Sequence, residues 1–416
     1  MSEPDTITNA QGARIDARSA LASQASSRSG WSAVFAMTLC VAVLIASEFM
    51  PISLLTPIAS GLRMTEGQAG QAIAVSGLFA LITSLGISSA TRGIDRRRVL
   101  LSLAVAMVAS GIMVALAPNA IVFMAGRALV GVVIGGFWSM SAATVMRLVP
   151  VAEVPRALGF LNGGNALATT IAAPLGSFLG QYVGWRGAFF AVVPLAALTF
   201  GWMFATLPSM PSERAANRGS VFRVLRQPGV PSGMLAVTLL FLGQFALFTY
   251  LRPFLETVTR LSVSTLSLVL LLMGVAGLLG TWLIGIALRT RLHGLLVLMP
   301  LGMAGLAVAL RVVGRVPVAV GVLLAGWGLI GTAAPVAWWT WVTRTLPDDA
   351  EAGGGLMVAV IQLGIAIGAI VGGLVFDASG AGATFLSSAG ILVLAALAAY
   401  AARPTHRPAS MARERQ

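Results

Sequence analysis

Lysine is absent from this chain, and charge of either sign is scarce. All 27 basic residues are arginines, and charged residues make up 10% of the 416 positions, against about 25% in soluble domains. Without lysine the chain lacks the phosphate-binding loop of ATP-driven pumps, because that loop requires one. It also contains no GxSxG or HExxH motif, so the sequence predicts that the protein is not an enzyme.

Cysteine and histidine are almost absent too. The single cysteine, Cys40, has no partner for an intrachain disulfide, and His293 and His406 are too far apart in the sequence to indicate a metal site. We therefore expect neither a metal nor a cofactor. Apolar residues, by contrast, make up 57% of the chain, and the mean hydropathy is +0.90. This composition predicts a polytopic membrane protein, because a soluble fold of this length could not cover so much apolar surface.

Apolar blocks separated by polar breaks predict an all-α integral membrane fold of twelve spans. The spans are expected at residues 33–57, 70–90, 99–117, 120–143, 157–180, 186–206, 232–253, 264–287, 294–312, 317–341, 355–376 and 382–401. The longest break is rich in Pro, Ser and Arg and divides the spans six and six. The predicted organisation is a disordered tail at 1–30, a six-helix bundle at 31–206, a linker at 207–231, a second six-helix bundle at 232–402 and a tail at 403–416.

The arginines predict how the spans are oriented. If the N terminus is cytoplasmic, 20 arginines fall in cytoplasmic segments and 6 in outer segments, with Arg127 left inside a span. Basic residues accumulate in the cytoplasmic loops of membrane proteins. We therefore expect both termini in the cytoplasm, and we interpret the arginines as topology signals rather than as a nucleic-acid-binding surface.

Two full charges remain inside predicted spans, Glu48 in the first and Arg127 in the fourth. A charge in the bilayer costs roughly 2.5–3.5 kcal/mol or more, so such residues are usually functional. At 1.5 Å per residue both lie roughly 10–13 Å from the outer ends of their spans, which would allow an ion pair or a proton-dependent exchange between them. We interpret Glu48 as the proton carrier of a transporter and Arg127 as the group that tunes it. The alternative is a static pair that locks two helices together.

Amide, hydroxyl and aromatic side chains inside the spans are candidate substrate contacts. We select Trp138, Asn162, Asn165, Gln244, Tyr250 and Gln362. Such a set suits a small, neutral, polar and flat ligand held by stacking and hydrogen bonds. Any one of them can instead be an interhelical hydrogen bond or an interfacial anchor, as we expect for Trp341.

The arrangement of the spans carries the first resemblance to a known family. With six spans on each side of a basic linker, residues 31–402 resemble the major facilitator superfamily, and residues 93–98 (GIDRRR) are similar to its loop signature. Thr91 and Arg97 stand where that signature has glycines. The resemblance implies a cytoplasmic latch formed by Asp95, Arg96 and Arg98.

Two further motifs fit the same family. Residues 127–131 (RALVG), followed by Gly135, resemble the fourth-span motif of proton-coupled members, whose arginine assists proton transfer. Residues 173–176 (APLG) resemble the fifth-span motif of antiporters, with Ala173 in place of the usual glycine. That motif is typical of exporters, so the resemblance implies export rather than uptake.

A more specific resemblance, within the drug:proton antiporter branch, is to bacterial purine ribonucleoside efflux pumps. It rests on residues 135–142, 146–150, 173–180, 243–246, 248–253 and 358–363, while residues 48–57 are similar to the first span of bacterial sugar and nucleoside efflux proteins. It implies proton-driven export of inosine, guanosine and purine analogues across the inner membrane, with the proton gradient as the energy source. We expect a monomer without a nucleic-acid partner. The nearest alternative is a sugar or multidrug:proton antiporter of the same fold; an uptake permease, or a sensor or scaffold that keeps only the fold, are the others.

Overall fold

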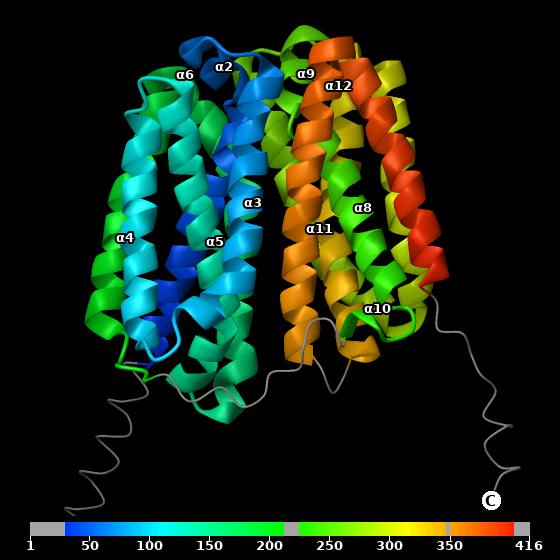
Figure 1. Ribbon diagram of the computed structural model, residues 1–416. Coiled ribbons are helices and arrows are strands. Elements are labelled where there is room, and N and C mark those ends of the chain that lie inside the picture. The colour runs from blue at the N-terminus through cyan, green and yellow to red at the C-terminus, as the bar shows by residue number, and fades with distance from the viewer. Residues whose placement is uncertain (1–29, 212–223, 347–349, 403–416) are drawn as a thin grey trace, which may run out of the picture.

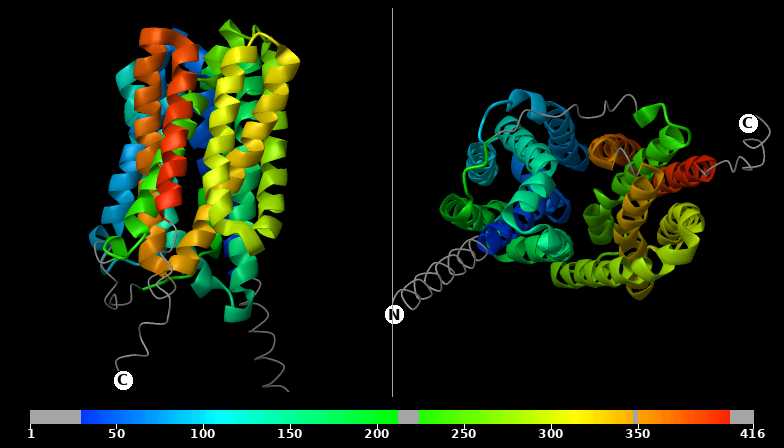
Figure 2. Two further views of the ribbon diagram at one scale, coloured as in Figure 1. Left: turned by 90° about the vertical axis from the view of Figure 1, so that its right-hand side faces the viewer. Right: turned by 90° about the horizontal axis from the view of Figure 1, so that it is seen from below.

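The computed structural model describes residues 30–211, 224–346 and 350–402 (Figure 1). Within these ranges the chain forms long helices that run roughly along one axis, and no strand (Figures 1 and 2). The predicted tails at 1–30 and 403–416, except for Gly30, lie outside the described residues, as does much of the predicted linker at 207–231.

The helices fall into two groups in chain order. The first group comprises the helix Gly30–Ser53, α2 (Leu55–Leu62), α3 (Glu66–Ala90), α4 (Arg96–Ala115), α5 (Ala120–Leu148), the short 3-10 helix η1 (Val151–Glu153) and α6 (Val154–Thr206). The second comprises α8 (Val230–Phe248), α9 (Leu251–Thr257), α10 (Val263–Val313), α11 (Pro317–Thr345) and α12 (Ala350–Ala401). Seen from below, the two groups lie side by side (Figure 2).

Ten helices of the described chain are long and apolar enough to cross a membrane, with α10 counted as two (Val263–Leu288 and Arg291–Val313) because its backbone is not helical at Arg291. Two of them, with 56 and 49 residues, are more than twice as long as the roughly 20 residues that one crossing needs. Each is broken at one glycine in the left-handed region, Gly184 (φ 69°) in α6 and Gly380 (φ 73°) in α12. Counting each as two crossings gives the predicted twelve, and the chain is a multi-pass membrane protein with six spans in each half.

Two hydrophobic clusters of the described residues correspond to the two halves. The halves meet along α3 with α12 and along α6 with α10. Phe49 packs against both clusters, and Tyr250 of the second half is part of the cluster of the first. The core is therefore continuous from one half to the other near the end of the first helix.

Trp341 is buried between helices, whereas the expected interfacial anchor would be exposed. Its side chain is 2% exposed and packs against α8 at Gly233, where an added Cβ would lie 2.2 Å from the indole ring. The glycine opposite makes room for the ring, so Trp341 joins two helices of the second half.

The two ends of the bundle differ. The first helix begins and α12 ends at the lower end in Figure 1, which we name the terminal face. The short helices α2 and α9 lie at the upper end, which we name the opposite face.

Candidate functional site

Arg127 lies where α5 meets the first helix and α3, and only 1% of its side chain is exposed. Its Nη1 donates to the Ser47 carbonyl (2.7 Å), and its Nη2 donates to the Glu48 carbonyl (3.2 Å) and to Ser76 Oγ (3.1 Å). Its Nε donates to the Ala72 carbonyl (3.2 Å). One guanidinium thus binds the backbones of two other helices at the same level.

Glu48 lies beside this arginine, but the two side chains form no ion pair in the described part of the chain. Arg127 acts on the Glu48 carboxyl through its charge, while its N–H groups are bonded to carbonyls and a hydroxyl. The predicted neighbours are therefore together, and the predicted ion pair is replaced by hydrogen bonds from the guanidinium to the backbone that carries the acid. This arrangement leaves the carboxylate available to another partner.

Gln362 of α12, which comes from the other half, is a neighbour of this carboxyl. Its amide lies close enough to the Glu48 carboxyl to act on it, yet its Nε2 has no hydrogen bond of normal length. Glu48 is 6% exposed and Gln362 is 5% exposed. A buried amide donor without a full partner is costly, so it marks a place where a ligand can supply one.

A pair of aromatic rings adjoins the acid. Phe49 stacks on Phe245 of α8 with ring centroids 6.0 Å apart and planes 29° apart. Phe245 continues the stack to Phe241 (6.4 Å, 20°). Sequence reasoning did not identify Phe49 or Phe245 as site residues. The signal in the sequence was that Phe49 directly follows the intramembrane acid.

Four other predicted substrate contacts show no interaction with Glu48 in the described residues. Trp138 is half-buried against the core of the first half, and Asn162 is exposed and donates to a carbonyl of its own helix (2.9 Å). Asn165 is half-buried on that same helix, and Gln244 is directed toward α11, where its Nε2 lies 2.9 Å from the position of an added Cβ on Gly331. Among the predicted contacts, Gln362 is the one whose side chain interacts with Glu48 in the described residues.

Tyr250 lies between the two halves in this conformation. It is fully buried, and its single hydroxyl proton is shared between the carbonyls of Ala369 (2.8 Å) and Gly67 (3.3 Å). An added Cβ on Gly70 would lie 2.1 Å from that hydroxyl, so the glycine allows the close approach. Tyr250 therefore joins the two halves instead of lining an open site.

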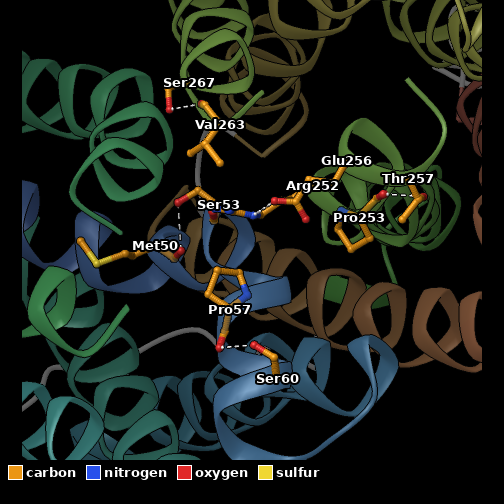
Figure 3. A network of polar contacts seen from close by, with 10 residues as sticks. All are labelled: Met50, Ser53, Pro57, Ser60, Arg252, Pro253, Glu256, Thr257, Val263 and Ser267. Atoms are coloured by element: carbon orange, nitrogen blue, oxygen red, sulfur yellow. Dashed lines mark hydrogen bonds and ion pairs between the residues drawn. The ribbon is translucent and has the colours of Figure 1, made fainter. Parts of the chain in front are cut away.

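Two further polar contacts join the halves toward the opposite face. Asp377 of α12 accepts hydrogen bonds from Thr65 Oγ1 (2.6 Å) and from the Gly67 backbone N–H (3.0 Å). Arg252 donates to the carbonyl of Ser53 and pairs with Glu256 (2.8 Å), as Figure 3 shows. Since the first helix ends at Ser53, that carbonyl has no partner within the helix, and a cation there is favourable.

These contacts, together with Tyr250, show that the halves are held together toward the opposite face. We name them the closure. Replacing Arg252 by Ala is expected to loosen it, because hydrogen bonds to a charged group contribute about 1.5–3 kcal/mol each. In a Ser53→Cys reporter with Cys40→Ala, labelling by a membrane-impermeant maleimide from the opposite face should rise about tenfold or more.

The matched control for the closure is Arg260→Ala, which removes an exposed arginine at the same face. Its labelling rate should equal that of the reporter alone. Equal rates for Arg252→Ala and Arg260→Ala would show that Arg252 does not hold the closure.

At the terminal face, Asp95 begins α4 and ties it to the end of α6. Its carboxylate accepts from the backbone N–H groups of Arg97 (2.8 Å) and Met210 (2.9 Å) and from the Ser209 hydroxyl. The guanidinium of Arg97 also ties α4 to α6, because it donates to the Phe204 carbonyl (2.8 Å). Of the predicted latch, Arg96 contributes its backbone N–H to the Met210 carbonyl (3.1 Å), and Arg98 contributes charge near Asp95.

The hydrogen bond from Ser209, with those from Met210 and Arg97, holds the pKa of Asp95 below its usual range. Because the pKa of Asp95 is lower in the folded state than in the unfolded state, the stabilisation that these hydrogen bonds give is present above the ordinary pKa and is lost as the pH falls through the folded-state pKa.

Asp95→Ala is expected to destabilise the protein by about 1 kcal/mol at pH 7, as for loss of a helix cap. Asp95→Asn keeps a cap acceptor and should lose less. Melting temperatures in detergent at pH 7 check both; equal losses would exclude the capping role.

Comparison with known proteins agrees with this architecture. The family described as Major Facilitator Superfamily matches residues 37–357. The chain is 58% identical over 370 residues to the "Transcription regulatory protein OpdE" of Pseudomonas aeruginosa, covering 88% of this chain and 92% of that one. It is 42% identical over 370 residues to the "Purine ribonucleoside efflux pump NepI" of Salmonella typhimurium, covering 89% and 93%.

Two solved structures share the fold. One is a bacterial homolog of the human lysosomal transporter Spinster in an inward-facing and unoccupied conformation, with a TM-score of 0.74, 16% identity and coverage of 90% of this chain and 97% of that one. The other is a D-xylose-proton symporter, with a TM-score of 0.71, 17% identity and coverage of 89% and 97%. Twelve crossings in two halves, the family match and the relatives together show that this chain belongs to the major facilitator superfamily, a family of transporters rather than enzymes.

Proposed function

We propose that this protein exports purine ribonucleosides across the bacterial inner membrane in exchange for protons, with both termini in the cytoplasm. The observation that carries the proposal is the buried carboxyl of Glu48 at the meeting of the two halves, next to a fixed guanidinium and an amide that lacks a full partner. Relatives named as purine ribonucleoside efflux pumps, 42% identical over 370 residues, support the choice of substrate.

The geometry suggests how exchange would work. With the halves joined toward the opposite face, Glu48 and Gln362 would be reached from the terminal face, where a neutral ligand can donate to the carboxylate and accept from the amide. When the closure opens and the terminal face closes, a proton that reaches Glu48 removes that acceptor and favours release. A site near the middle of the membrane, between two halves that rock against each other, is common to transporters built from repeats.

The test is transport of labelled inosine into everted membrane vesicles that carry the protein, with and without an imposed proton gradient. Gradient-dependent accumulation above that of vesicles without the protein is expected. If the folded protein accumulates no inosine, growth protection against arabinose or ethidium by overexpression would indicate the sugar or multidrug alternative. Loss of labelled substrate by everted vesicles, in place of accumulation, would indicate an uptake permease.

A second candidate function is regulation, and the name of the 58% identical relative, a transcription regulatory protein, favours it. A sensor that keeps the transporter fold would not need a proton-carrying acid. It predicts that the Glu48→Gln variant still fully complements every phenotype of a strain from which the protein has been deleted. Complementation that fails with Glu48→Gln would instead tie the phenotype to transport.

A further inference from the structure

Phe49 and Phe245 form an aromatic contact between the two halves of the transporter. Phe49 is at the end of the first helix, Phe245 is on α8, and their rings stack with centroids 6.0 Å apart. Phe49 is half-buried and packs against the cores of both halves. This ring pair therefore belongs to the surface that must separate when the halves move.

The spacing of the rings decides what can enter between them. Carbon atoms in contact lie about 3.5–4.0 Å apart, so a flat ring held between two phenylalanines requires about 7–8 Å between them. At 6.0 Å the two rings contact each other and leave no room for a third. Because the two rings are already in contact, their faces must move apart by one ring thickness, about 3.5–4.0 Å, before a third ring can enter.

Polar groups lie at the same level of the first helix as Phe49. Glu48 directly precedes Phe49 in the chain, and the amide of Gln362, 5% exposed and with an Nε2 that lacks a hydrogen bond, is close enough to the Glu48 carboxyl to act on it. A carboxylate accepts hydrogen bonds, and an amide both donates and accepts. These two groups complement the edge of a neutral ring that carries an N–H donor next to a carbonyl acceptor.

We propose that Phe49 and Phe245 are the two walls of a slot that binds the flat heterocycle of the substrate, and that Glu48 and Gln362 bind the polar edge of that heterocycle. The proposal rests on the proposed function for the identity of the substrate as a purine nucleoside. It adds the residues that select a flat ring, neither of which was among the predicted substrate contacts.

One consequence concerns the transport cycle. Because one wall belongs to each half, a bound ring takes the place of a contact between the halves. Substrate binding then weakens one of the contacts that hold this conformation, while the gained stacking on both rings compensates for the loss. A sugar without a flat ring cannot make this replacement, so it would bind without separating Phe49 from Phe245.

The experiment measures equilibrium binding of labelled inosine, labelled chloramphenicol as another neutral aromatic compound, and labelled arabinose to the purified full-length protein. Phe49→Leu and Phe245→Leu should each weaken inosine binding about tenfold, within the range measured for loss of one base–aromatic stack. Phe245→Tyr keeps a ring and should bind inosine within about threefold of the original protein. The matched control is Phe190→Leu, a change at an exposed phenylalanine of α6.

The outcomes separate the slot from the substrate. Inosine binding that is unchanged in both leucine variants, with the protein monodisperse, overturns the slot. Binding of chloramphenicol but not inosine, weakened in both leucine variants, supports the slot and overturns the purine substrate. Binding of arabinose alone, or of neither aromatic probe, overturns both. An equal loss of binding in Phe190→Leu would show a general loss of structure and would also overturn the assignment to these two rings.

Discussion

Glu48→Gln is expected to abolish proton-gradient-driven transport and to leave exchange of substrate for substrate intact. Glutamine has almost the same size as glutamate and can still accept a hydrogen bond, but it cannot carry a proton. The surroundings accept a neutral side chain, because the guanidinium of Arg127 is bonded to carbonyls and to Ser76 and not to the Glu48 carboxylate. Accumulation of inosine in everted vesicles should therefore fall to the level of vesicles without the protein, while counterflow of labelled against unlabelled inosine continues.

The matched control is Glu153→Gln. This acid lies in the 3-10 helix before α6 and accepts a hydrogen bond from Trp31 Nε1 (2.6 Å). The amide oxygen of a glutamine at this position can accept the same hydrogen bond. Its gradient-driven transport should equal that of the original protein. Gradient-driven accumulation that persists in Glu48→Gln would remove Glu48 from the coupling mechanism. Loss of counterflow in a variant that is still folded would assign Glu48 to substrate binding alone.

The fold could be read from the sequence because membrane spans are long apolar runs, and their ends are marked by glycine and arginine. Gly184, Arg291 and Gly380 break the long helices, and each lies in a gap between predicted spans. Helical crossings must satisfy their own backbone hydrogen bonds in lipid, so the number of apolar runs nearly determines the architecture. The predicted depth of Glu48 and Arg127 likewise followed from counting residues along a helix of known rise.

The site could not be read in the same way, because a sequence does not show how each helix is rotated about its axis. Tyr250 and Gln362 looked equivalent as polar residues within spans. In the structure the Tyr250 hydroxyl binds carbonyls of both halves, whereas the Gln362 side chain is near enough to act on Glu48. The Phe49–Phe245 stack joins residues almost 200 positions apart, so no local pattern could reveal it. An ion pair between Arg127 and the carboxylate was one possibility, but the hydrogen-bond acceptors of the guanidinium include main-chain carbonyls that carry no sequence signal.

Arg127→Lys is expected to be almost as damaging as Arg127→Ala, because geometry as well as charge holds this residue. The planar guanidinium reaches four acceptors on two helices at 2.7–3.2 Å. A lysine ammonium has three donors on one atom and cannot span them. Arg127→Ala leaves the Glu48 carboxyl buried without an opposite charge, a change that costs about 3–5 kcal/mol in other proteins. Both variants should lose most transport and melt at lower temperature in detergent.

The control is Arg186→Lys, which keeps the positive charge and removes a guanidinium at another position. This arginine is exposed and donates to the Ala117 carbonyl (2.8 Å). An exposed substitution changes stability by about 0.5 kcal/mol or less. If Arg127→Lys keeps both transport and melting temperature, charge alone suffices and the hydrogen bonds to the first helix and α3 are incidental.

A double variant separates the structural role of Arg127 from its role in coupling. Glu48→Gln combined with Arg127→Met removes both charges at once, so no buried charge is left without a partner. Its melting temperature should recover part of the loss seen in Arg127→Ala, since residues in one network are not additive. Gradient-driven transport should stay absent, because the proton carrier is gone. Recovery of transport together with stability would show that the pair serves only to hold the helices, and would leave the coupling acid to be found elsewhere in the chain.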